Sequence, residues 1–139
     1  MMADVPPMDE TRLEEIARKH GMVLVLLYGS AVSGPTHARS DVDVAVLLDR
    51  ATVPFREWGE VAADLQALWP GRKVDLAFLN RADPLFLRKI TERCRLLYGS
   101  PRRFAELKMY AFKRYQDHRR YLGLEREYVA RTLRALAAS

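Results

Sequence analysis

The alternation of apolar and polar positions along this chain predicts a series of helices and strands. Residues 8–20 carry Leu13, Ile16 and Ala17 at spacings of three and one, which place them on the apolar stripe of an amphipathic helix. The run MVLVLLY at residues 22–28 lies between glycines, and its continuous apolar character favours a strand buried on both faces. The first two elements we expect are therefore a helix and a buried strand.

Shorter elements continue this alternation. We expect strands at residues 41–48, 73–79 and 94–99, and helices at residues 55–69 and 83–93. The core candidates of the first of these helices are Phe55, Val61, Leu65 and Leu68. This order predicts an α+β fold, a two-layer α/β arrangement in which helices flank a small mixed β-sheet.

Helix start signals occur twice in the second half of the chain. Asp83-Pro84 and Ser100-Pro101 each place a capping side chain before a proline. After Pro101 the apolar spacing stays helical, and we expect Gly123 to kink or split the segment because glycine weakens a helix interior. The pattern thus predicts a domain at residues 1–100 and a C-terminal helical extension, residues 101–139, packed on the same domain.

Positive charge is concentrated in that extension. The chain of 139 residues has a net charge of +5, yet residues 101–139 hold ten Lys and Arg against four Asp and Glu. Such asymmetry suggests an acidic partner. Interleaved tyrosines and arginines are typical of interfaces, so we expect residues 101–137 to bind a partner protein.

Cysteine content and hydropathy narrow the class of protein. The single cysteine, Cys94, excludes an internal disulfide, and its apolar neighbours predict a buried structural thiol. The longest apolar run is too short to cross a membrane, and no secretory signal is visible. We therefore expect a cytoplasmic protein without a membrane partner.

Three aspartates form the candidate chemical site. Asp41 and Asp43 are two positions apart on an expected strand, so both carboxylates face one side of the sheet, while Val42, Val44 and Val46 face the core. Asp75 interrupts an apolar strand, and burial without a partner would be costly. If the strands of Asp43 and Asp75 are neighbours, the three carboxylates meet and suit Mg²⁺, with two ions clamping a phosphoryl displacement.

The turn at Gly29-Ser30 directly follows the first buried strand. Glycine permits a close backbone approach, and backbone N–H groups at such a turn favour phosphate. Each feature alone has a structural alternative: the glycine and serine form an ordinary turn, Asp41 is a cap, Asp43 pairs with an arginine, and Asp75 pairs with Arg72 or Lys73. The combined spacing across two strands favours a phosphate and metal site.

This pattern resembles the DNA polymerase β-like nucleotidyltransferase superfamily. The matching positions are Gly29, Ser30, Asp41, Asp43 and Asp75. The small size and basic helical C-terminus resemble the minimal nucleotidyltransferase (MNT) branch, whose members are often antitoxins paired with a helical HEPN ribonuclease toxin.

The resemblance implies the nucleotidyltransferase fold and transfer of AMP from ATP to a tyrosine of a HEPN-type toxin, which silences the toxin. It implies Asp41, Asp43 and Asp75 as metal ligands and catalytic residues, with Asp75 also a candidate base. It also implies that the nucleotide is contacted by Gly29, Ser30, Arg39 and Ser40. The chain departs from many relatives at Ala31 and Val32, and Arg39 is positioned to compensate for the missing basic residue.

Three other functions remain open at this point. A nucleotidyltransferase acting on a small molecule normally needs more chain for an acceptor pocket. An antitoxin that only blocks its partner by binding has no use for three clustered acids. Direct nucleic-acid binding through the C-terminal helix is disfavoured because Glu125 and Glu127 dilute its arginines. An oligomer in complex with the partner is also left open.

Overall fold

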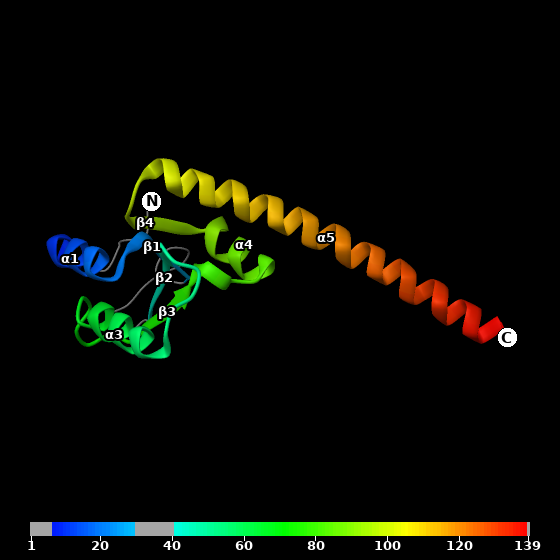
Figure 1. The fold of residues 1–139 in the computed structure, drawn as a ribbon, viewed down its shortest axis with the longest axis horizontal. Coiled ribbons are helices and arrows are strands. Elements are labelled where there is room, and N and C mark those ends of the chain that lie inside the picture. The colour runs from blue at the N-terminus through cyan, green and yellow to red at the C-terminus, as the bar shows by residue number, and fades with distance from the viewer. Residues whose placement is uncertain (1–6, 30–40, 139) are drawn as a thin grey trace.

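The computed structural model describes residues 7–29 and 41–138. The elements are α1 (Glu10–His20), β1 (Met22–Tyr28), β2 (Val42–Leu48), α3 (Phe55–Gln66), β3 (Val74–Phe78), the 3₁₀ helix η1 (Leu79–Arg81), α4 (Pro84–Glu92), β4 (Cys94–Tyr98) and α5 (Pro101–Ala138). This confirms the expected α+β order of elements. Figure 1 shows a small domain from which α5 extends far beyond the other elements.

The four strands form one mixed sheet in the order β3-β2-β1-β4. β1 is antiparallel to both β2 and β4, and β2 is parallel to β3. The continuous apolar run of β1 is explained by its position, because an interior strand is covered on both faces. The expected adjacency of the strands that carry Asp43 and Asp75 is thereby confirmed.

Helices cover the two faces of the sheet with separate cores. α1 and α3 cover one face, and the valines at alternate positions of β2, namely Val42, Val44 and Val46, are fully buried against them. α4 and the first turns of α5 cover the opposite face, where Ala45 is buried. Asp43 alternates with the valines, so it lies on the α4 and α5 face.

Helix ends follow the capping signals of the sequence. The Asp83 carboxylate accepts hydrogen bonds from the backbone N–H groups of Leu85 and Phe86, at 3.0 Å each. The Ser100 hydroxyl accepts bonds from the N–H groups of Arg102 and Arg103, at 3.1 and 3.3 Å. Both expected starts are confirmed, because these side chains satisfy N–H groups that have no partner within the helix.

Three side-chain or helix expectations need correction. α5 is one continuous helix of 38 residues, so the expected break at Gly123 is wrong; one glycine costs only about 1 kcal/mol in a helix. Phe55 is 90% exposed because the first residue of α3 faces solvent, although Val61, Leu65 and Leu68 are buried as expected. Cys94 is only half-buried, and this burial raises the pKa of its thiol.

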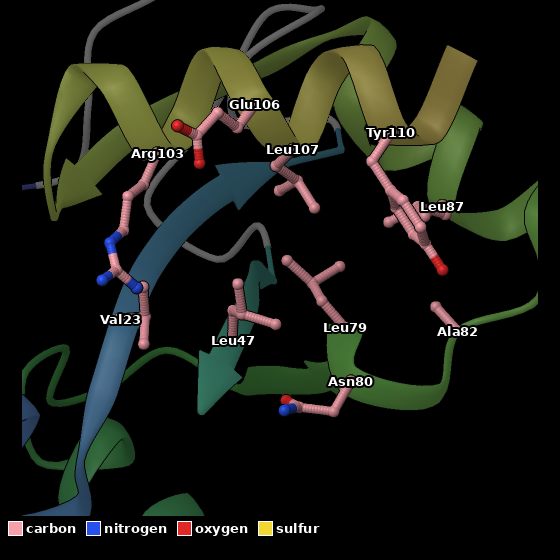
Figure 2. A pocket seen from close by; sticks show the side chains of 10 residues that line it. All are labelled: Val23, Leu47, Leu79, Asn80, Ala82, Leu87, Arg103, Glu106, Leu107 and Tyr110. Carbon is pink, nitrogen blue, oxygen red and sulfur yellow. The ribbon is translucent and has the colours of Figure 1, made fainter. Parts of the chain in front are cut away.

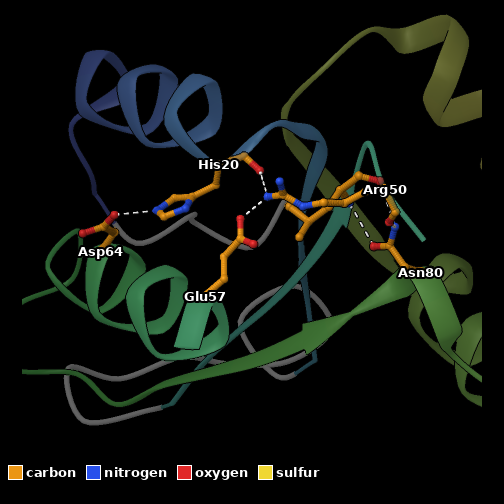
Figure 3. A network of polar contacts seen from close by, with 6 residues as sticks. His20, Arg50, Glu57, Asp64 and Asn80 are labelled. Carbon is orange, nitrogen blue, oxygen red and sulfur yellow. Dashed lines mark hydrogen bonds and ion pairs between the residues drawn. The ribbon is translucent and has the colours of Figure 1, made fainter. Parts of the chain in front are cut away.

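Polar side chains join α1 and α3 to the sheet (Figure 3). Buried His20 places Nε2 2.6 Å from Oδ2 of Asp64 on α3, and Arg50 donates to the His20 carbonyl and pairs with Glu57. Asn80 bonds to the backbone of Leu48, accepting from its N–H at 2.9 Å and donating to its carbonyl at 2.8 Å. These contacts attach α1, α3 and η1 to the end of β2.

Among the described residues, no helix has both the length and the apolar character needed to cross a membrane.

Candidate nucleotidyltransferase site

A row of polar side chains crosses the sheet on the face covered by α4. Tyr28 of β1 is opposite Asp43 of β2, and Asp43 is opposite Asp75 of the parallel neighbour β3. Residues directly opposite one another point to the same face of a sheet. The register therefore places a phenol and two carboxyl groups side by side.

The two carboxyl groups interact directly. Burial raises the pKa of Asp43, and the nearby Asp75, then Asp41, raise it further; a hydrogen bond between the side chains of Asp43 and Asp75 acts in the same direction. Two adjacent carboxylates repel each other, and a shared proton relieves that repulsion. The pair therefore concentrates negative charge that either a shared proton or a bound cation neutralises.

Lys73 offsets little of this charge. Its Nζ lies 3.7 Å from Oδ1 of Asp75, but the two side chains are 72% and 45% exposed. An ion pair so open to solvent contributes little to stability. Asp75 therefore does form the expected ion pair with Lys73, but it also keeps its interaction with Asp43.

Asp41 stands apart from the other two acids. β2 begins at Val42, so Asp41 lies one residue before the strand, where its side chain is exposed. It still adds to the negative potential at Asp43. Within residues 7–29 and 41–138, no three His, Cys, Asp or Glu side chains form a complete metal-binding group. Asp43 and Asp75 are therefore brought together, whereas Asp41 lies one residue before β2 and outside this pair.

Gly29 closes the β1 end of the row. It has φ of 77°, and a Cβ built on it would lie 2.1 Å from Oδ2 of Asp43. Only glycine provides both this backbone conformation and this closeness. The Gly29 backbone is therefore packed against the Asp43 carboxyl group, while Ser30, Arg39 and Ser40 lie outside the described residues.

Tyr28 is a residue that the sequence patterns did not single out. Its ring meets Phe86 of α4 edge to face, with 6.3 Å between the centroids. Burial raises the pKa of the Tyr28 phenol, and Asp43 and Asp75 raise it further. Tyr28 thus forms a wall of the site on the α4 side, and its position directly before Gly29 was the available signal.

Gln66 at the end of α3 fixes the approach to β3. Its Oε1 accepts from the N–H of Val74 at 3.0 Å, and its Nε2 donates to the carbonyls of Trp69 and Arg72. The carbonyl of Lys73 in turn accepts from the N–H of Val42 at 2.8 Å. These bonds hold β3 in the register that sets Asp75 against Asp43.

A separate cavity of about 370 Å³ lies on the same face of the sheet (Figure 2). Its lining includes Leu47, Leu79 and Leu87, with Arg103 and Tyr110 of α5. Leu47 is four residues along β2 from Asp43, or about 13 Å at 3.3 Å per residue. The cavity is therefore distinct from the row of acids.

Paired carboxyl groups thus lie beside a glycine turn on a small mixed sheet. Residues 11–103 match the family described as polymerase beta, nucleotidyltransferase. This match covers more than half of the sequence, and the chain belongs to that family. The resemblance inferred from Gly29, Asp43 and Asp75 is thus confirmed at the level of the family. A comparison with curated proteins gives no match.

Solved structures share the fold over nearly the whole chain. One, described as a toxin-antitoxin with AMP-PNP, has 23% identity and a TM-score of 0.69, covering 91% of this chain and 98% of its own. Another is a toxin-antitoxin mutant with two aspartates changed to glutamate, at 22% identity, TM-score 0.68 and the same coverage. A third, the tri-AMPylated Shewanella oneidensis HEPN toxin in complex with MNT antitoxin, has 21% identity and a TM-score of 0.63, covering 89% and 94%. At these identities the likeness establishes the fold.

Proposed function

We propose that this chain is a protein adenylyltransferase that acts as an antitoxin, transferring AMP from ATP to a tyrosine of a HEPN-type toxin and so neutralising it. The observation that carries the proposal is the pair of opposed carboxyl groups, Asp43 and Asp75, packed beside Gly29. Membership of the nucleotidyltransferase family supports the transfer chemistry. Fold neighbours described with AMP-PNP and with an AMPylated HEPN toxin support the nucleotide and the acceptor.

The donor set fits Mg²⁺. Asp43 and Asp75 are hard oxygen ligands that repel each other, and Asp41 brings a third carboxylate to the same end of β2. We expect these three residues to hold two ions. When bound, Mg²⁺ supplies charge neutralisation at the triphosphate and at the attacking and leaving oxygens.

The residues of the chain have distinct tasks in this scheme. Asp43 is fixed by the buried valines on either side of it, so its carboxylate is held in place before ATP arrives. Asp75, whose side chain is 45% exposed, accepts the proton of the acceptor hydroxyl. The acceptor oxygen then forms a bond to the α-phosphorus as the bond to the β-phosphate oxygen breaks and pyrophosphate leaves.

The glycine turn holds the phosphates. The Gly29 backbone lies against Asp43, so a phosphate bound there sits next to the carboxylates. Ser30, Arg39 and Ser40 are the proposed further phosphate contacts. Tyr28 and Phe86 wall the site toward α4 and limit where an acceptor can enter.

Mass spectrometry of the acceptor tests the proposal. A purified HEPN-type protein is incubated with ATP, Mg²⁺ and either wild type, Asp43→Ala or Glu60→Ala. We expect wild type and Glu60→Ala, which changes an exposed acid on α3, to add one or more AMP groups to a tyrosine. Asp43→Ala should reduce the rate by at least about a hundredfold, as for loss of a group that stabilises transition-state charge.

Two outcomes would contradict the proposal. Neutralisation of the toxin without added mass, equally by wild type and Asp43→Ala, would identify an antitoxin that acts only by binding. Binding of ATP that is unaffected by Mg²⁺ and by Asp41→Asn/Asp43→Asn in calorimetry would show that the acids are not the metal site.

A further inference from the structure

One face of α5 is consistently less exposed than the rest of the helix. Its least exposed residues are Phe104, Leu107, Ala111, Tyr115, His118 and Leu122. They recur at intervals of three or four, so they form a single stripe along the helix. Leu107 and Ala111, which are 8% and 1% exposed, join the core of the second sheet face.

α4 covers much of this stripe as α5 leaves the sheet. The Arg88 guanidinium of α4 lies 3.9 Å from the ring centroid of Tyr115. Beyond Leu122 every described residue of α5 is exposed, and Figure 1 shows no other element beside that part of the helix. The domain therefore covers the stripe only as far as Leu122.

The stripe itself continues past the point where its cover ends. Arg126, Val129 and Leu133 follow Leu122 on the same face at spacings of four, three and four. Val129 and Leu133 are 47% and 60% exposed. We call Leu122, Arg126, Val129 and Leu133 the distal stripe. An isolated helix of this length is marginal in water, so a covering partner would stabilise it.

The charges around the distal stripe indicate the chemistry of a partner that could bind there. Arg126 lies within the apolar positions, and a guanidinium is costly to cover unless a carboxylate meets it. Residues 119–138 hold five arginines against Glu125 and Glu127. A second copy in parallel register would place Arg126 against Arg126, which is unfavourable. An occupant with an apolar groove bordered by carboxylates is complementary.

We propose that the distal stripe is the docking surface for the acceptor protein, which meets it with an apolar groove and an acidic side chain opposite Arg126. This inference rests on the proposed function, because the acceptor is taken to be the HEPN-type toxin. The distal stripe is separate from Asp43 and Asp75. It therefore affects how tightly the acceptor binds, whereas the carboxylates carry out the chemical step.

Matched helix variants test the docking surface. Val129→Ser/Leu133→Ser removes two stripe side chains, and Leu124→Ser/Tyr128→Ser removes two side chains from another face that are 61% and 69% exposed. Affinity for the purified HEPN-type protein is measured by calorimetry, after circular dichroism establishes that each variant is folded. We expect the stripe variant to lose at least about tenfold in affinity and the control to change by less than about twofold.

The charge is tested separately from the apolar contact. Arg126→Glu should also weaken binding by about tenfold or more, since it opposes the acidic partner, whereas Arg131→Glu on the far side of the helix should have a smaller effect. Equal affinity of the stripe variant and the control overturns the proposal. So does self-association of wild type that the stripe variant abolishes, or binding of duplex RNA in place of the HEPN-type protein.

Failure of docking and failure of the proposed function give different results. Stripe-dependent binding with no AMP added by wild type would leave the docking surface standing and overturn the adenylyltransferase. AMP addition by wild type, with an unchanged KM for the acceptor in the stripe variant, would support the adenylyltransferase and overturn the docking surface. The expected result is a raised KM for the acceptor with kcat unchanged, because the stripe does not touch the reacting atoms.

Discussion

Gly29 and Asp43 are packed so closely that no side chain fits at position 29. The positive φ of 77° already favours glycine, and a Cβ would overlap the Asp43 carboxylate at 2.1 Å. In the proposed function the same closeness sets the phosphate-binding turn next to the Asp43 carboxylate, which is the proposed metal ligand. The glycine is thus required by both geometry and the proposed chemistry.

Asp43→Asn is expected to change stability and activity in opposite directions. Burial, Asp75 and Asp41 raise the pKa of Asp43, so the folded state binds its proton more tightly than the unfolded state does. Stability is therefore lost as pH rises through the raised pKa and regained below it. Without divalent cations, the variant should be more stable than wild type at pH 7 by about 1 kcal/mol.

Urea unfolding in the presence of a chelator measures this difference. The advantage of Asp43→Asn should shrink as the pH is lowered through the raised pKa of Asp43, because the wild-type carboxyl group then gains its proton. AMP transfer by the same variant should fall by at least about a hundredfold. A variant less stable than wild type at pH 7 would show that Asp43 is favourably paired in the folded protein.

The residue scale also shows what sequence patterns reveal and what they miss. Alternation along the strands correctly placed Asp43 and Asp75 opposite the valine core, because it depends only on the period of a strand. Tyr28 was missed, because its place beside Asp43 depends on the antiparallel register of β1 and β2. Its place directly before Gly29 marks only the end of β1, whereas the register that brings it beside Asp43 is a property of the assembled sheet.

At the scale of elements, polar contacts from α1 to Asp64 hold α1 to α3, and the buried His20 makes one of them. His20 is 3% exposed, and its Nε2 lies 2.6 Å from Asp64, which also pairs with Lys19 at 3.1 Å. Burial opposes ionisation of Asp64, but its hydrogen bonds with His20 and Lys19 outweigh this and lower its pKa. The contact therefore stabilises the fold when Asp64 is ionised.

Asp64→Ala should destabilise the protein by about 1–3 kcal/mol at pH 7, because the buried His20 loses its partner. An acid with a lowered folded pKa contributes stability above its unfolded pKa of about 4 and loses it as pH falls through the folded value. Urea unfolding at pH 7 and at pH 3 should therefore show a smaller loss at the lower pH.

Two variants serve as controls for this contact. Asp64→Asn retains an acceptor and should cost less than Asp64→Ala. Glu15→Ala, which removes an exposed pair with Arg12, should change the free energy of unfolding by less than about 0.5 kcal/mol. Equal effects of Asp64→Ala and Glu15→Ala would mean that the His20 contact contributes nothing to the joining of α1 and α3.

Element boundaries were predictable where a local cap determines them. Asp83 and Ser100 begin their helices because their side chains bind N–H groups within three residues. The helix break expected at Gly123 was wrong because no cap lies there. A single glycine destabilises a helix only slightly, and the residues around it favour the helix. Phe55 was misassigned because apolar character alone does not show which way the first turn of α3 faces.

On the scale of the whole molecule, α5 belongs to the domain at one end and stands clear of it at the other. Leu107 and Ala111 are part of the core, whereas all described residues after Leu122 are exposed. The charge asymmetry of the sequence indicated a partner-binding segment but did not show where the domain stops. That point depends on the length of α4 and the angle at which α5 crosses it.

Two truncations should therefore differ sharply in stability. A chain ending at Gly123 loses only exposed residues, and its free energy of unfolding should change by less than about 1 kcal/mol. A chain ending at Ser100 loses Leu107 and Ala111 and uncovers Leu24 and Leu26 on the sheet, which should cost about 3 kcal/mol or more. Urea unfolding followed by circular dichroism measures both. Similar losses in the two truncations would show that the outer half of α5 stabilises the domain directly, and equal stability of wild type and the shorter chain would show that α5 is not part of its core.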